Sequence, residues 1–107
     1  EEPFFQDCRH ALSPDGVFVT NWWSGDKRYQ RFIERLLNVF EGRVLELPAE
    51  SHGNMAVMAF QSSPKEQNLD KLKKRAEKLS GQYGLDFKRM LSDLKANNPN
   101  NGKHFYL

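Results

Sequence analysis

The sequence predicts an α/β fold, namely the later part of a doubly wound sheet followed by two helices. Three apolar runs of strand length occupy residues 17–23, 43–48 and 54–60, and an amphipathic helical pattern separates the first two. A strand, a crossover helix and two further strands are typical of the end of a doubly wound domain. The opening strand–Gly-loop–helix unit, which usually holds the cofactor, is absent from these 107 residues, and no G-x-G occurs. We therefore expect the chain to show where a substrate lies rather than how a cofactor is bound.

The first predicted element is a short amphipathic helix over residues 3–12, because apolar side chains recur there at helical spacing. A turn should end it, since Pro14 fixes φ, Asp15 can bond to nearby backbone and Gly16 accepts a positive φ. Cys8 falls on the apolar face of this helix, which predicts a buried and unreactive thiol.

The next elements are a strand and a crossover helix. Residues 17–20 are apolar on both faces, as in strands of a sheet that is covered on both sides. Ser24 or Asp26 can cap the following helix, and Gly42 has the position of a glycine just beyond a helix end. The expected inner face of this helix consists of Tyr29, Phe32, Ile33, Leu36 and Phe40.

The last two strands, at 43–48 and 54–60, are expected to form a hairpin, because the loop between them is short. A hairpin makes them antiparallel, whereas the preceding strand–helix–strand unit should be a parallel crossover. Every residue from 55 to 60 is apolar, which favours a place inside the sheet rather than at its edge. The predicted order therefore places the strand at 54–60 between the other two.

Composition divides the chain into three parts. Residues 1–61 form a partial α/β domain and residues 62–96 a helical extension, in which Gly81 and Gly84 should separate two amphipathic helices. Residues 97–107 begin with a polar stretch rich in helix breakers, which predicts a mobile tail.

Bulk properties exclude several classes of protein. The net charge is only +2 and the basic residues are spread out, so no nucleic-acid partner is expected. The longest apolar runs have strand length, and the acidic N-terminus lacks the basic start of a secretory signal, so we expect a cytoplasmic protein without a membrane span. One cysteine excludes an internal disulfide, and the three histidines lack metal-ligand spacing.

The candidate site follows from topology. In open α/β sheets, ligands bind beyond the carboxyl ends of the parallel strands. Two separated segments, 21–25 and 50–54, should meet at this edge and face one cleft. The candidate substrate-binding residues there are Asn21, Trp22, Trp23, Glu50 and His52.

Each of these side chains has a functional and an ordinary interpretation. Because Trp22 and Trp23 are adjacent in a strand, one faces each side; a ring could form a wall for a methylene chain or face a cation, or both could simply cover the sheet. Glu50 could pair with an amine or be a solvated loop charge. His52 could accept a proton or bond to loop backbone. No residue is assigned to catalysis, to a cofactor or to a metal.

Five features within residues 4–61 occur together in a recognisable order: FFQDCRHAL, PDGVFVTN, Phe40-Glu41-Gly42, Leu47-Pro48 and Gly53-Asn54-Met55-Ala56-Val57-Met58. In these features the segment resembles the C-terminal half of the spermidine synthase-like, or polyamine aminopropyltransferase, family. The resemblance implies a Rossmann-like fold of the class I S-adenosylmethionine methyltransferase type. It also implies polyamine biosynthesis, in which an aminopropyl group passes from decarboxylated S-adenosylmethionine to a diamine such as putrescine.

The sequence departs from the family pattern in three respects. The Gly-rich nucleotide loop and the acidic residues that hold the ribose and the amine precede this segment in the family, so the resemblance implies a chain that binds no cofactor and is inactive alone. The family usually has an aromatic residue soon after the Leu-Pro pair, where this chain has residues 49–52. The two-helix extension is also not part of the core family pattern.

The residues alone leave three hypotheses about function open. The chain is part of an aminopropyltransferase whose substrate is a small polyamine, or part of an S-adenosylmethionine-dependent methyltransferase with another acceptor. Alternatively it is a non-catalytic α/β interaction module, since exposed strand edges and apolar faces favour association, including formation of a homo-oligomer.

Overall fold

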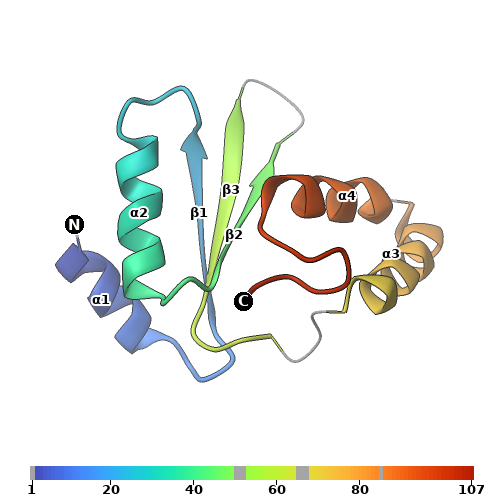
Figure 1. The fold of residues 1–107 in the computed structure, drawn as a ribbon, viewed down its shortest axis with the longest axis horizontal. Helices are drawn as coiled ribbons and strands as arrows, with labels where there is room; N and C mark the ends of the chain where they lie inside the picture. Colours follow the sequence, from blue (N-terminus) through green and yellow to red (C-terminus); the bar gives the residue numbers. More distant parts are fainter. Residues whose placement is uncertain (1, 50–52, 65–67, 85) are drawn as a thin grey trace. The chain divides into compact units, whose positions relative to one another are not determined.

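The computed structural model describes residues 2–49, 53–64, 68–84 and 86–107. Its helices and strands, in chain order, are α1 (Glu2–Ala11), β1 (Val17–Trp23), α2 (Tyr29–Val39), β2 (Val44–Pro48), β3 (Asn54–Phe60), α3 (Leu69–Tyr83) and α4 (Phe87–Asn97) (Figure 1). The α/β class is therefore confirmed. The chain forms two compact units, one of residues 1–64 with Leu107 and one of residues 65–106. The functional division at residues 61 and 97 stays a prediction.

The sheet of the first unit has the order β1-β3-β2, with β3 antiparallel to both neighbours. Val57, in the middle of β3, lies opposite Thr20 of β1 and Glu46 of β2. The predicted hairpin and the central place of the last strand are thus confirmed. Because both outer strands are antiparallel to β3, β1 and β2 run in the same direction.

One face of this sheet holds the core, and α1 and α2 cover it (Figure 1). Along β1, half-buried residues alternate with exposed ones, so Phe18, Thr20 and Trp22 face the helices. Val17 and Val19 point to the other face and are 40% and 59% exposed. The expectation that residues 17–20 are covered on both faces is therefore wrong for the part of the chain that the structure describes. The buried core residues are Phe5, Phe32, Ile33, Leu36, Val39, Phe40, Val44, Val57 and Ala59.

Helix α2 begins later than the capping residues suggested. Its N-cap is Arg28, which makes no side-chain capping bond. Ser24 and Asp26 bind elsewhere: the Ser24 hydroxyl donates to the Gly53 carbonyl, and the Asp26 carboxylate accepts the Arg28 N–H. Both candidate caps are therefore wrong, because Ser24 Oγ binds the backbone just before β3 and Asp26 binds within the turn between β1 and α2.

The end of α2 uses two residues with positive φ. Glu41 has φ +54° and Gly42 has φ +83°. The Gly42 N–H donates to the Leu37 carbonyl over 2.9 Å, which is the outer bond of a Schellman motif. The predicted stop is thus confirmed in kind but falls one residue earlier, because Glu41, not Gly42, comes immediately after the C-cap Phe40.

In the second unit, α3 and α4 have side-chain caps at their starts. Asn68 accepts the Lys71 N–H, and Asp86 accepts the Arg89 N–H. Gly84 ends α3 in the left-handed region at φ +69°. Gly81 lies inside α3, so the expected break at this residue is wrong and the break at Gly84 is confirmed.

The segment after α4 folds back on itself through hydrogen bonds. The buried Asn98 donates through Nδ2 to the Leu94 carbonyl, and Asn101 Oδ1 accepts the His104 N–H. The Phe105 side chain is buried, and its backbone pairs with Asn100. The predicted mobility of this segment stays a prediction.

Candidate functional site

Ser24 joins the end of β1 to the start of β3. Its backbone N–H and its Oγ both donate to the Gly53 carbonyl, over 2.8 and 2.7 Å. Where β2 leads into β3, the Ala49 N–H donates to the Asn54 carbonyl over 2.8 Å. Two segments that are distant in the sequence, 21–25 and the described part of 49–54, are thereby held side by side at one edge of the sheet.

The two tryptophans at this edge have different surroundings. Trp22 faces the core and stacks on Phe32, with ring centroids 4.1 Å apart and an interplanar angle of 27°. Trp23 faces the opposite side and is 59% exposed. The alternation predicted for adjacent strand residues is confirmed. For Trp22 the structure agrees with the ordinary interpretation, in which the ring covers the sheet.

The Trp23 ring lies against two glycines. A Cβ atom placed on Gly25 would be 2.5 Å from Cζ2 of Trp23, and one placed on Gly53 would be 3.3 Å from its Nε1. The indole therefore touches the backbone of both segments that meet at this edge. Neither glycine was among the candidate residues of the sequence analysis.

The remaining candidates are placed only in part. Asn21 is exposed and lies two residues before Trp23, on the same face of β1. Glu50 and His52 lie outside the described residues. Binding of a substrate by any of the five candidates stays a prediction.

The turn between β1 and α2 contains an ion pair. Asp26 accepts from the Arg28 N–H over 2.8 Å and from Arg28 Nη2 over 2.9 Å. The side-chain hydrogen bond with Arg28 is the main cause that lowers the pKa of Asp26 to about 2, and the backbone bond from the same residue lowers it further. The Asp26 N–H also donates to the Trp23 carbonyl, so an ionised carboxylate lies three residues after the aromatic residue in the same turn.

A second polar pair lies between α2 and β2, and sequence reasoning missed it. The hydroxyl of Tyr29 donates to Oε1 of Glu46, which faces the core side of the sheet. Burial, and next the bond to Glu46, raise the pKa of the Tyr29 phenol. The available signal was a single acidic residue inside the apolar strand RVLELP, because a carboxylate in such a strand needs a partner.

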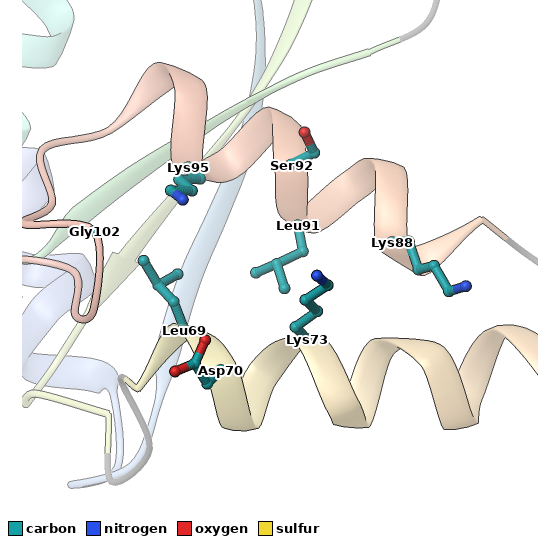
Figure 2. A pocket seen from close by; sticks show the side chains of 8 residues that line it. All are labelled: Leu69, Asp70, Lys73, Lys88, Leu91, Ser92, Lys95 and Gly102. Atoms are coloured by element: carbon teal, nitrogen blue, oxygen red, sulfur yellow. The ribbon is translucent and has the colours of Figure 1, made fainter.

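The second unit contains a cleft between α3 and α4 with a volume of about 290 Å³ (Figure 2). Three ammonium groups and one carboxylate surround it, so its charge is positive, and like charges would repel a cationic amine. This cleft is therefore unsuited to a diamine. Its lining residues are Leu69, Asp70, Lys73, Lys88, Leu91, Ser92, Lys95 and Gly102.

Neither a metal site nor a membrane span is found in the described part of the chain. No group of three or more His, Cys, Asp or Glu side chains within these ranges could hold a metal ion. None of the helices there is long and apolar enough to cross a bilayer.

Comparison with known proteins finds relatives that are named polyamine aminopropyltransferases. The chain is 86% identical over 107 residues to the polyamine aminopropyltransferases of Neisseria meningitidis serogroups A and B. It is 60% identical over 106 residues to the polyamine aminopropyltransferase of Chromobacterium violaceum. The resemblance predicted for residues 4–61 is thus confirmed, and in these relatives it also includes the two-helix extension, which was expected to lie outside the family pattern.

The chain spans 41% of the length of each of these relatives. No family model and no solved structure matches it.

Proposed function

We propose that this chain is the C-terminal part of a polyamine aminopropyltransferase, which transfers an aminopropyl group from decarboxylated S-adenosylmethionine to a diamine such as putrescine. The observation that carries the proposal is the 86% identity to two proteins of that name over all 107 residues. The meeting of segment 21–25 with the described part of 49–54 at one sheet edge supports it, since open α/β sheets bind ligands at such edges.

The reaction is a displacement at carbon. The unprotonated amine nitrogen of the acceptor attacks the methylene carbon bound to the donor sulfonium; a C–N bond forms, the C–S bond breaks, and its electron pair stays on sulfur. The ammonium that results loses a proton. Catalysis of such a step depends on placing the two reactants in line. On one side this would be done by an acceptor wall that consists of Asn21, Trp22, Trp23, Glu50 and His52.

We assign Asn21, Trp22, Trp23, Glu50 and His52 to the acceptor side. Trp23 offers an exposed aromatic surface, and Trp22 supports the same strand end from the core. Glu50 would pair with an acceptor ammonium group and His52 would hydrogen-bond to the acceptor, since a partly desolvated cation needs a carboxylate or an acceptor atom beside it.

Donor binding and proton removal are assigned to the rest of a longer protein, because the relatives are more than twice the length of this chain. We infer that the three strands belong to a larger doubly wound, Rossmann-like sheet, in which the exposed face with Val17 and Val19 is covered. The 107 residues alone would then bind no donor and transfer nothing. We place the protein in the cytoplasm, with no nucleic-acid partner and with the capacity to form a homo-oligomer.

Two measurements test this proposal on the full-length parent protein. Isothermal titration should show tighter binding of decarboxylated S-adenosylmethionine than of S-adenosylmethionine, and an assay with putrescine should yield the aminopropylated product. The 107-residue chain is the matched sample and should give neither signal. Methyl transfer from S-adenosylmethionine in place of aminopropyl transfer would replace this function by the methyltransferase alternative.

A further inference from the structure

We propose that Trp23 provides the aromatic surface on which the alkyl-ammonium chain of the acceptor lies, and that Gly25 and Gly53 are positioning residues that hold its ring. This inference rests on the proposed function and identifies which part of the acceptor wall makes the contact. Three features carry it: the exposure of the ring, its two glycine contacts, and the different position of Trp22.

Gly25 makes room for the six-membered part of the ring. A Cβ at this position would be 2.5 Å from Cζ2 and 2.7 Å from Cε2 of Trp23. Both distances are far below van der Waals contact, so any other residue would push the ring away. The φ angle of Gly25 is outside the left-handed region. Space, not backbone conformation, therefore requires a glycine here.

Gly53 supports the five-membered part of the same ring from the other segment. A Cβ there would be 3.3 Å from Nε1 of Trp23 and 3.2 Å from Oγ of Ser24. The two bonds from Ser24 to the Gly53 carbonyl keep this backbone in place. The Trp23 ring is thus in contact with two short segments, one that follows β1 and one that precedes β3.

The opposite side of the indole is available to a ligand, since Trp23 is 59% exposed. Trp22 is not available, because its ring stacks on Phe32 in the core. Indole is the side chain with the strongest attraction for an ammonium group above its ring, and its apolar surface also suits a methylene chain. Two charges of the adjoining turn, Asp26 and Arg28, form an ion pair with each other.

The test uses the full-length protein and steady-state kinetics with both substrates varied. Gly25→Ala, which displaces the ring, and Trp23→Ala, which removes it, should each raise the diamine KM about five- to tenfold. The donor KM and kcat should change by less than about twofold, because the lost contact binds the acceptor equally well in the ground state and in the transition state. Trp23→Phe should recover most of the affinity. Gly81→Ala is the matched control, since nothing lies within 4 Å of a Cβ at that helical position.

The double variant Gly25→Ala/Trp23→Ala should have the diamine KM of Trp23→Ala alone, because Gly25 acts only through the ring. An unchanged KM in Trp23→Ala, or effects that multiply in the double variant, would overturn the inference. If the parent transfers no aminopropyl group, the proposed function fails, and the acceptor role fails with it. The glycine support is still read separately from the ¹⁹F resonance of fluorotryptophan-labelled Trp23, which should shift in Gly25→Ala and not in Gly81→Ala.

Discussion

Arg9 and Gln61 bind each other twice although 52 positions separate them. Arg9 Nε donates to Gln61 Oε1 over 2.9 Å, and Gln61 Nε2 donates back to the Arg9 carbonyl over 2.8 Å. Arg9 Nη1 also donates to the carbonyl of Val39, the last residue of α2, over 2.6 Å. One arginine therefore connects α1, the end of α2 and the residue after β3, at the end of the sheet that lies away from the candidate site.

Replacing Gln61 should weaken the first unit. Gln61→Ala removes both bonds and leaves a partly buried guanidinium with fewer acceptors, which should lower the free energy of unfolding by about 1–3 kcal/mol. Urea unfolding followed by circular dichroism measures this. Gln6→Ala is the control, because Gln6 is exposed on α1, the helix that carries Arg9. This variant should change the unfolding free energy by less than about 0.5 kcal/mol. Equal effects of the two variants would contradict the role of Gln61.

Removal of the Tyr29 hydroxyl, which donates a hydrogen bond to Glu46, should lower the free energy of unfolding. Tyr29→Phe should cost about 1–2 kcal/mol of unfolding free energy at neutral pH, since the half-buried carboxylate of Glu46 loses the hydrogen bond from this hydroxyl. The folded state raises the pKa of the phenol, so its stabilisation is complete below the unfolded pKa of about 10 and is lost as the pH rises above that value. The difference between the parent and Tyr29→Phe should therefore shrink in alkaline solution. If this difference in unfolding free energy stays constant across that pH range, ionisation of the Tyr29 phenol does not affect the stability of the folded state.

The pair of Asp26 and Arg28 should contribute to stability in the opposite pH range. The folded pKa of Asp26 is about 2, below the value of about 3.9 in an unfolded chain. The stabilisation is therefore complete above about pH 4 and disappears as the pH falls toward 2. Asp26→Asn should flatten the pH dependence of the urea midpoint in this window, with Asp15→Asn as a control in another turn. Identical curves for Asp26→Asn and the parent would remove Asp26 as a contributor.

The two tryptophans should differ sharply in their structural cost. Trp22→Ala removes a ring stacked in the core and should lower the unfolding free energy by about 3 kcal/mol. Trp23→Ala removes a mostly exposed ring and should cost about 1 kcal/mol or less. Denaturant unfolding of both variants checks this, and similar costs would mean that the exposed ring is structural.

The two glycines near the end of α3 should respond oppositely to alanine. Gly81 lies inside the helix with free space around a Cβ, so Gly81→Ala should raise the unfolding free energy by about 0.5–1 kcal/mol. Gly84 ends the helix at φ +69°, so Gly84→Ala should lower it by about 1 kcal/mol. Thermal unfolding reports the sign of each change, and two changes of equal sign would contradict the assigned helix end.

The strand order could be predicted from sequence because it depends on a strong local signal. An uninterrupted apolar run at 55–60 needs neighbours on both sides, and the short loop before it fixes an antiparallel hairpin. The start of α2 could not be predicted, because Ser24 and Asp26 have several possible partners. Their oxygens bind the Gly53 carbonyl and the Arg28 donors, and only the folded turn decides between these and a helix cap.

The site was predictable in outline and not in its contacts. Alternation along β1 places Trp22 and Trp23 on opposite faces, but the ring of Phe32 determines which of them joins the core. Gly25 and Gly53 resemble ordinary turn glycines in a sequence, and only the position of the Trp23 ring shows why one of them excludes a side chain. Cys8 lies on the predicted face of α1 but is half-buried rather than buried, because this helix packs over the core mainly through Phe5.

The central position of β3 has a consequence for the order of folding. Strands β1 and β2 do not pair with each other and have β3 as their shared partner, so these three strands cannot form their common sheet until residue 60 has been made. The β2–β3 hairpin closes a short loop and can form within microseconds, whereas the pairing of β1 with β3 closes a longer loop that contains α2. Of these three strands, the one that is made last is therefore the one that connects the other two.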